Sequence, residues 1–300
     1  MHIRPLVVDD LPAVSTRLRA EFPAEAVDQA NLARQVWGDP HYEPGLNLGA
    51  WDDDGLLRGV LLGVVRSGRA WLKLLTVGPE PAIAEALLAA FESALSRSLA
   101  GVIDVSGSSP VYLLHGIDPC DTRTTLFFSG HGFRKVDEAY NMVCDLTRPS
   151  FDTAAEELAL EALGYRLARL AEGDQLALTE FVDRRFSPNW TAEALHALTL
   201  RPVPCHVAWF DGRIVAFAAA EVTNPGWFGP MGTHARHRRH GVGRVLLLRC
   251  LRDLRTRGYR EATIGWVGPM GFYERACGAR VSRVFWQYRK HLVPPAEVGD

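Results

Sequence analysis

The chain has 300 residues, of which 47% are hydrophobic and 23% charged, and its formal net charge is −2 at pH 7. This is ordinary globular composition, and the length is long for one domain and comfortable for two. No apolar run is long enough to span a bilayer, so we expect no membrane partner.

The five cysteines, at positions 120, 144, 205, 250 and 277, show no paired spacing. This pattern favours reduced thiols over a disulfide framework or a zinc site. The first residues, Met1–Pro5, lack the apolar core of a signal peptide. We therefore expect a cytoplasmic protein.

Charge is unevenly placed along the chain. Residues 1–150 carry 13 Lys and Arg against 19 Asp and Glu, whereas residues 151–300 carry 20 against 16. Nine arginines fall between positions 236 and 260. A polyanionic cofactor is expected in the second half. Nucleic acid would also fit a basic patch, but the overall pI near 6.6 argues against it as the main partner.

The first half predicts a short strand and two helices, followed by three antiparallel strands with short polar turns. A helix and one more strand complete this part of the chain. The expected bounds are helices 11–21 and 24–37, strands 46–51, 56–65 and 70–77, helix 81–99 and strand 101–105.

The second half restarts the same order of elements, which is an internal repeat signal. Its expected bounds are a linker helix 152–163, strand 165–170, a helix ending at 184, helix 191–198, and strands 205–210, 213–222 and 227–233. The last strand contains Gly229, Pro230 and Gly232. Such residues are poor in a regular strand and predict a bulge or splayed pairing.

The stretch Arg238–Arg244 reads as a loop that becomes the N-terminus of a helix. Gly241 and Gly243 remove side chains that would block a ligand and free the backbone for a tight turn. The first amides of a helix lack partners, and the helix dipole adds positive charge there. These features predict an anion site, usually for a diphosphate. The alternative is a plain helix start near arginines, because a short glycine motif alone is weak evidence.

The Arg-x-x-Gly-x-Gly spacing of Arg238–Gly243 resembles the phosphate-binding signature of the GNAT superfamily of N-acyltransferases. Downstream, an expected strand at 261–266 and the stretch 271–279 resemble the next strand and late helix of that superfamily. The resemblance covers roughly residues 161–291 well, and the earlier half faintly. It implies an α/β (α+β) fold with two tandem GNAT-like domains, each a mixed, mostly antiparallel sheet flanked by helices.

The first half has the element order of this fold without its motifs. Its matching loop, 78–82, has no arginine and no Gly-x-Gly, its two prolines remove amides, and Glu80 would repel a phosphate. The place of the tyrosine falls on Phe127 or Phe128, which cannot donate a proton. We interpret this half as a degenerate GNAT-like domain, with an unrelated α/β domain as the alternative. The expected division is 1–147 for this domain, 148–164 for a linker with its helix, 165–292 for the catalytic GNAT domain, and 293–300 for a tail.

The resemblance implies acetyl-CoA (coenzyme A) as the cofactor, with its phosphates on the loop and its pantetheine arm against the preceding strand. The implied cofactor-binding residues are Met231, Gly232, Thr233, Arg238, Arg239, His240, Gly241, Val242, Gly243 and Arg244.

Tyr273 would be the general acid that protonates the departing thiolate, with a packing aromatic as the alternative. Glu221, at the end of a strand, is the favoured general base, and His234 is the second candidate. An exposed strand-end carboxylate is the alternative for Glu221. His234, His237 and His240 recur every three residues, but the spacing crosses a loop and no carboxylate accompanies it, so we expect no metal.

Two departures from the superfamily pattern bear on the end of the cofactor arm and the aim of the tyrosine. Trp266 stands where the superfamily often has an asparagine. Tyr273 lies five residues before Gly278, where four is usual, and Ala279 stands where phenylalanine is common.

We therefore expect an acetyl-CoA-dependent N-acetyltransferase that transfers an acetyl group directly to a primary amine, with a small molecule as the acceptor. The alternative is a non-catalytic acyl-CoA-binding sensor. Two halves meeting edge to edge would form an internal pseudo-dimer, so a monomer or a weak homodimer is expected.

Overall fold

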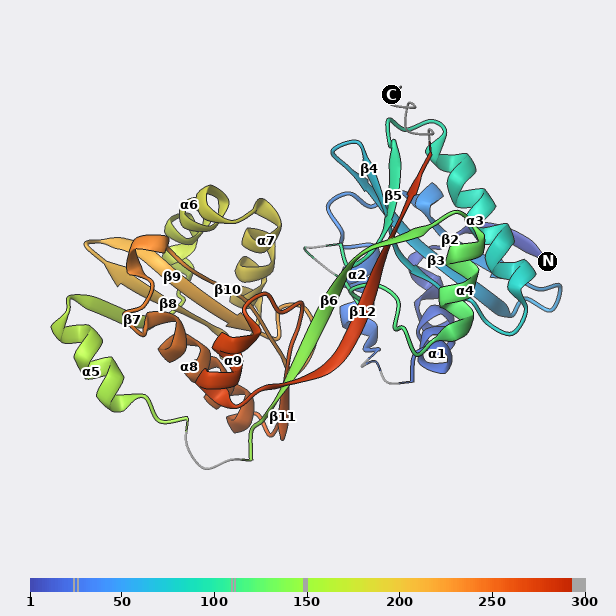
Figure 1. Ribbon diagram of the computed structural model, residues 1–300. Coiled ribbons are helices and arrows are strands. Elements are labelled where there is room, and N and C mark those ends of the chain that lie inside the picture. Colours follow the sequence, from blue (N-terminus) through green and yellow to red (C-terminus); the bar gives the residue numbers. More distant parts are fainter. Residues whose placement is uncertain (24, 26, 109, 111, 148–150, 293–300) are drawn as a thin grey trace, which may run out of the picture. The chain divides into compact units, whose positions relative to one another are not determined.

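The chain forms two compact units (Figure 1). Unit 1 consists of Met1–Ala139 and the chain from Val284 onward, and unit 2 consists of Tyr140–Arg283. The expected tail, 293–300, and residues 148–150 of the expected linker lie outside the described residues. The computed structural model describes residues 1–23, 25, 27–108, 110, 112–147 and 151–292.

Within its described residues, unit 1 builds a sheet in the order β1-β2-β3-β4-β5-β12, with antiparallel pairs except between β4 and β5. Helices α1 and α2 bury their apolar faces in one cluster on this sheet, and α3 and α4 do so in another. The strands are β1 His2–Pro5, β2 Asn47–Trp51, β3 Leu57–Arg66, β4 Arg69–Leu75 and β5 Val102–Val105; the helices are α1 Leu11–Glu21, α2 Gln29–Val36, α3 Pro81–Leu95 and α4 Thr122–Gly130.

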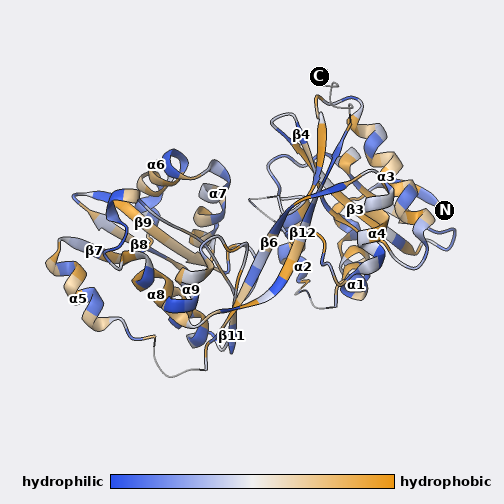
Figure 2. Ribbon diagram, viewed as in Figure 1, coloured by the Kyte–Doolittle hydropathy of each residue, from blue (hydrophilic) through white to orange (hydrophobic). Residues whose placement is uncertain are grey.

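Unit 2 repeats this plan, with the sheet order β6-β11-β10-β9-β8-β7 and a parallel pair between β10 and β11. Helix α8 buries an apolar stripe on one cluster, and α6 and α7 pack on another. Figure 2 shows apolar residues along the central strands and mixed character along the helices, as expected for helices that bury one side. The strands are β6 Arg134–Asp145, β7 Tyr165–Arg169, β8 Cys205–Phe210, β9 Arg213–Ala220, β10 Trp227–Thr233, β11 Glu261–Ile264 and β12 Arg280–His291; the helices are α5 Ala154–Ala162, α6 Gln175–Arg185, α7 Pro188–His196, α8 Val242–Thr256 and α9 Met270–Cys277. Short 3-10 turns occur at Val8–Asp10, Pro44–Leu46, Glu172–Asp174, Ala197–Thr199 and Ala235–His237.

The two halves of the sequence exchange their last strands. Residues Met142–Asp145 of β6 pair with β11 and complete the sheet of unit 2. Residues Tyr288–His291 of β12 pair with β5 and complete the sheet of unit 1. The division between units therefore falls near 140 and 284, and not at the expected 147–165 and 292. A sequence pattern indicates that a segment is a strand, but not which sheet edge it joins.

The predicted fold class is confirmed, and most expected elements begin and end within a few residues of their structural bounds. The largest shift concerns α2, which begins at Gln29 where a helix from residue 24 was expected. The Asp28 carboxylate accepts a hydrogen bond from the backbone N–H of Asn31 at 2.8 Å, which fixes the start of the helix. Within the described part of the chain, no helix is long and apolar enough to cross a membrane.

Candidate active site

Strand β10 parts from its neighbour at the centre of unit 2. It pairs with β11 at Trp227 and Phe228, and then continues to Thr233 beside β9. Its register with β9 shifts between Phe228 and Met231, so the predicted bulge is present at Gly229 and Pro230. Beyond this point the side of β10 that faces away from β9 is open.

The alternation of an antiparallel ladder decides which backbone groups face this open side. The N–H of His234 donates to the carbonyl of Val215 at 2.8 Å. Counting back in steps of two, Gly232 faces β9, whereas Met231 and Thr233 direct their backbone groups away from it. This edge therefore carries the polar backbone of these two residues, and the Thr233 carbonyl accepts a hydrogen bond from Nε of Arg238 at 3.2 Å.

The loop that follows β10 ends in a row of unpaired amides. Among the described residues, no hydrogen-bond acceptor contacts the backbone N–H groups of residues 239–244. Gly241 caps α8 with a left-handed φ of +87°, and Arg239 adopts a φ of +67°. Because these N–H groups lie at the positive end of the α8 dipole, they form a site for an anion.

Two glycines are required by close packing around this edge. A Cβ at Gly232 would lie 2.3 Å from the nearest ring atom of Phe186, so only glycine fits there without movement. A Cβ at Gly243 would lie 3.1 Å from the Thr233 hydroxyl and 3.4 Å from Cε of Met231. Gly243 thus lets the first turn of α8 pack against the end of β10.

Acidic residues of α5 hold arginines of α8. Arg244 forms an ion pair with Glu156, and Arg249 forms one with Glu157. The hydrogen bonds from Arg249 lower the pKa of Glu157 to about 2. The sequence analysis missed these pairs, although adjacent glutamates in the first turn of the linker helix were a signal for them.

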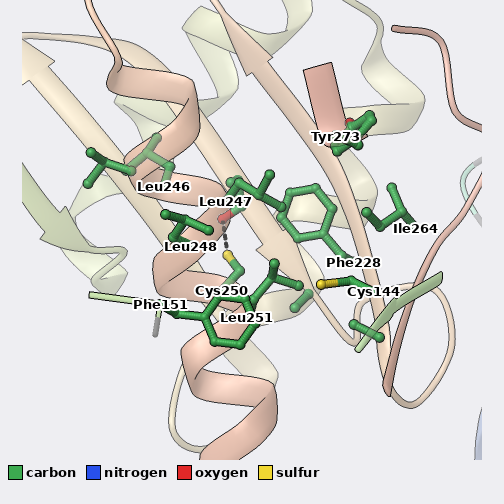
Figure 3. Packing of buried hydrophobic residues seen from close by; sticks show 14 of the residues in the cluster. Cys144, Phe151, Phe228, Leu246, Leu247, Leu248, Cys250, Leu251, Ile264 and Tyr273 are labelled. Carbon is green, nitrogen blue, oxygen red and sulfur yellow. Dashed lines mark hydrogen bonds between the residues drawn. The ribbon is translucent and has the colours of Figure 1, made fainter. Parts of the chain in front are cut away.

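Tyr273 lies on α9 at the edge of the apolar cluster (Figure 3) and is 7% exposed. Its ring centroid lies 5.0 Å from that of Phe272 and 6.2 Å from that of Phe228. Burial, followed by the nearby Cys277, raises the pKa of the Tyr273 phenol well above its usual value. Because this pKa is raised, Tyr273 keeps its proton at neutral pH.

Glu221 lies at the other end of α8 from the amide loop. Its side chain is 9% exposed and forms an ion pair with Arg257, which follows the last turn of α8. The helix between them and Gly241 is about 22 Å long, from 15 residues at 1.5 Å each. The structure therefore does not bring the favoured general base to the loop.

His234 directly follows β10 and lies beside the loop. Its Nδ1 accepts a hydrogen bond from the backbone N–H of Arg236 at 3.2 Å. Partial burial, and then the charges of Arg185, Arg236 and Arg238, lower the pKa of His234 below its usual value. A neutral imidazole can accept a proton only at its unprotonated nitrogen, which in His234 is Nδ1 and must first release the Arg236 N–H.

The ring of Tyr165 lies beside the two other histidines near the loop, His237 and His240. The Tyr165 hydroxyl lies 2.9 Å from Nδ1 of His237, and the rings of His234 and His237 lie 5.6 Å apart. No group of His, Cys, Asp or Glu that could hold a metal occurs in the part of the chain that the structure describes.

Asn141 supports the loop that precedes α9 and was missed from the sequence. Its side-chain oxygen accepts a hydrogen bond from the backbone N–H of Trp266 at 3.2 Å, and Tyr140 accepts one from Val267 at 2.8 Å. Trp266 itself is 40% exposed with a φ of +48°. Asn141 lies in β6, within the range 1–147 that was assigned to the first domain, so no local pattern pointed to its contact with the second half.

The loop of unit 1 that corresponds to the amide loop, residues 78–82, and the helix that corresponds to α9 have different contacts. Pro81 is the first residue of α3, and a Cβ at Gly78 would lie 3.0 Å from the Arg17 guanidinium. Phe127 and Phe128 of α4 are both buried in the core. A cavity of about 1140 Å³ lies beside this loop, lined by parts of α1, α3, α4, the end of β4 and the β2–β3 turn.

Comparison with known proteins agrees with this geometry. Residues 171–279 match the family described as Acetyltransferase (GNAT) family. No curated protein matches the chain. Among solved structures, a GNAT protein from Sphaerobacter thermophilus has a TM-score of 0.69 at 17% identity, covering 99% of this chain and 97% of its own. A tandem GNAT protein from the clavulanic acid biosynthesis pathway has a TM-score of 0.70 at 18% identity, covering 98% and 99%.

A third structure is a glucosamine N-acetyltransferase region of a fungal multi-domain β-N-acetylglucosaminidase, with a TM-score of 0.76 at 19% identity. It covers 96% of this chain, which spans 38% of that longer protein. Residues 171–279 of unit 2 therefore match the GNAT family, and the chain as a whole has the fold of tandem GNAT proteins.

The site in unit 2 fits the acetyl-CoA that this family typically uses. The unpaired N–H groups of 239–244 can donate hydrogen bonds to phosphate oxygens, and the exposed arginines at 238 and 239 add positive charge. The open backbone of Met231 and Thr233 continues from the loop as a ladder edge that an amide-bearing chain can pair with. These residues are among those predicted from the sequence to bind the cofactor, and their role stays a prediction.

Proposed function

We propose that the protein is an acetyl-CoA-dependent N-acetyltransferase that acts on the primary amine of a small molecule. The observation that carries the proposal is the continuity between six unpaired amides at 239–244 and the open edge of β10. A GNAT sequence match over the same residues supports acetyl transfer. Two structural neighbours, named for glucosamine and for a clavulanic acid pathway, support a small acceptor.

The loop and the strand edge would hold the two polar parts of the cofactor. Amides 239–244 bind phosphates, and the backbone of Met231 and Thr233 binds the amides of the pantetheine arm. When bound, acetyl-CoA supplies an activated acetyl group and a thiol leaving group. The unpaired N–H groups of 239–244 need no reorganisation before they bind, which is the condition for strong electrostatic stabilisation.

Tyr273 and His234 would handle the protons. Tyr273 holds a proton at its hydroxyl and can give it to a departing sulfur. His234 is neutral at pH 7 and can take a proton from the attacking amine, directly or through a water. A positioned acid or base contributes roughly 10²–10⁴ to a rate. Glu221 stays the alternative base, and its carboxylate forms an ion pair with Arg257 at the other end of α8 from the loop.

Unit 1 is proposed to be a degenerate GNAT domain that does not bind the cofactor in the same way. Its loop lacks the arginines and the Gly-x-Gly, and two prolines replace amide donors. The protein is proposed to work in the cytoplasm, a reducing compartment that suits the five free cysteines.

The test compares wild-type protein with Tyr273→Phe, using Tyr288→Phe, a buried tyrosine of unit 1, as the matched control. Release of free thiol from acetyl-CoA is measured against a panel of small primary amines, and binding of acetyl-CoA is measured by titration calorimetry. We expect Tyr273→Phe to bind normally but to lose about 10²-fold or more in kcat/KM. Binding without transfer to any amine would favour the sensor, and absence of binding would refute the proposal.

A further inference from the structure

Two cysteines that lie 133 residues apart in the sequence meet beneath α9. Cys144 belongs to β6 and is fully buried, and Cys277 is the last residue of α9 and is partly exposed. The sulfur of Cys144 lies 3.3 Å from the carbonyl oxygen of Cys277, so the side chain of Cys144 reaches the backbone of Cys277. Both residues lie within unit 2, and Figure 3 shows Cys144 at the border of its core.

The two thiols differ in the way that a reactive pair requires. The neighbouring Cys144, and a hydrogen bond from the backbone N–H of Ala279, lower the pKa of Cys277. The thiolate is the nucleophilic form, and partial exposure lets an oxidant reach it. Cys277 is therefore the attacking thiol, and buried Cys144 is placed to resolve it.

The other cysteines provide a contrast inside the same chain. Cys205 and Cys250 are both fully buried, and desolvation raises the pKa of Cys205 to about 12 and also raises that of Cys250. Neither is therefore a reactive thiolate. Cys120 is exposed in unit 1, and the next cysteine along the chain is Cys144.

The pair is joined to the proposed acid by one turn of helix. The Cys277 thiol donates a hydrogen bond to the carbonyl oxygen of Tyr273 at 3.1 Å. Moving the Cys277 sulfur into a bond with Cys144 removes this hydrogen bond and pulls the end of α9 toward β6. The position of Tyr273 then changes, whereas the amides of 239–244 lie on another helix.

We propose that Cys144 and Cys277 form a reversible disulfide in the presence of a peroxide, and that this bond lowers acetyl transfer. The effect on transfer rests on the proposed function, whereas formation of the bond does not. The Cys277 thiolate attacks a peroxide oxygen, the O–O bond breaks, and a sulfenic acid and hydroxide result. The Cys144 sulfur then displaces the hydroxyl as water, so two thiols lose two electrons and hydrogen peroxide becomes two waters. A dithiol reverses the step by exchange.

The first experiment treats the reduced full-length protein with graded hydrogen peroxide, blocks the remaining thiols with N-ethylmaleimide in acid, and maps peptides by mass spectrometry. We expect one crosslinked species that joins the Cys144 and Cys277 peptides, 2 Da lighter than the separate peptides and lost after dithiothreitol. Under these conditions Cys205 and Cys250 should stay reduced, so N-ethylmaleimide should alkylate both once the protein is unfolded. Free Cys144 and Cys277 at a peroxide concentration that fully oxidises Cys120 would overturn the proposal.

Variants separate the pair from general oxidation. Cys144→Ala should leave Cys277 as a sulfenic acid that dimedone labels, and Cys277→Ala should leave Cys144 unreacted. Cys120→Ala should form the crosslink as the wild type does. Since Cys144 is fully buried, far-UV circular dichroism checks each variant, and Cys277→Ala decides alone if Cys144→Ala does not fold. Labelling of Cys144 in Cys277→Ala would contradict the assigned roles.

Activity is measured on the same oxidised samples. We expect at least a tenfold lower kcat with acetyl-CoA binding unchanged, restored by dithiothreitol, and no peroxide effect in Cys277→Ala. A disulfide that forms without changing kcat would overturn the regulatory part. If reduced protein transfers no acetyl group, the proposed function has failed, and the peptide map still decides whether the disulfide forms.

Discussion

Replacing Gly241 with glutamate places a negative charge where the cradle of amides is expected to hold phosphates. Gly241 has a φ of +87°, and a Cβ built there meets no atom within 4 Å. A substitution therefore costs only the left-handed backbone, about 1–2 kcal/mol. Gly241→Ala carries the same backbone cost without the charge, so it is the matched control for Gly241→Glu.

The extra effect of the charge follows from Coulomb repulsion. One unit charge at about 4 Å from a phosphate oxygen is repelled by about 1 kcal/mol in bulk water and about 4 kcal/mol at an effective dielectric constant of 20. Because 1.4 kcal/mol is tenfold in affinity, Gly241→Glu should bind acetyl-CoA roughly 5-fold to several hundred-fold more weakly than Gly241→Ala. Rising salt should reduce the difference, since exposed charges are screened.

Thermal unfolding and calorimetric titration with acetyl-CoA measure this difference. A ligand at 100 times its dissociation constant stabilises the protein by about 2.7 kcal/mol, and a tenfold weaker variant under the same conditions gains about half of that. Equal affinity in the alanine and glutamate variants would refute the assignment of the amides to phosphates. If folded wild-type protein shows no shift, the loop is a plain helix start.

Two further predictions concern ion pairs in unit 2. Glu156→Gln should strengthen acetyl-CoA binding a few-fold by calorimetry, because Arg244 loses the carboxylate that competes with a phosphate; unchanged affinity would place Arg244 outside the cofactor site. Burial lowers the pKa of His206 despite its 2.8 Å contact with Asp253, so the folded state stays neutral while the unfolded state takes up a proton below pH 6.5. Stability should therefore fall as pH drops below 6.5, by at most about 1.4 kcal/mol per unit from this group. The free energy of unfolding, measured with urea, should depend less steeply on pH in His206→Gln than in the wild type. Equal slopes in the two proteins would contradict a neutral His206 in the folded state.

The features that could be predicted from the sequence are those carried by local pattern. The Gly-x-Gly loop, the helix after it and Tyr273 occur in one continuous stretch, and each depends on neighbours within a few residues. The bulge in β10 was predictable for the same reason, since Gly229 and Pro230 weaken any regular ladder. The order of elements in each half followed from strand and helix periodicity.

The features that could not be predicted depend on which distant segments meet. The exchange of β6 and β12 is invisible in a strand pattern, so Asn141 was assigned to the half that it does not support. Glu221 looked free at a strand end until folding placed Arg257 against it. Sequence distance hid the contact between Cys144 and Cys277 in the same way.

Strand β4 of unit 1 corresponds to β10 of unit 2, and the bulges of the two strands carry residues of different chemistry. In β4 the register shift leaves Lys73 as the extra residue, where β10 has Gly229 and Pro230. The Lys73 ammonium is buried, 2.9 Å from the Asp39 carboxylate, which also contacts Arg66 at 2.5 Å. Removing one partner of such a buried network typically costs about 3–5 kcal/mol. An ion network therefore closes this position in unit 1, whereas the corresponding edge of unit 2 keeps its backbone open for a ligand.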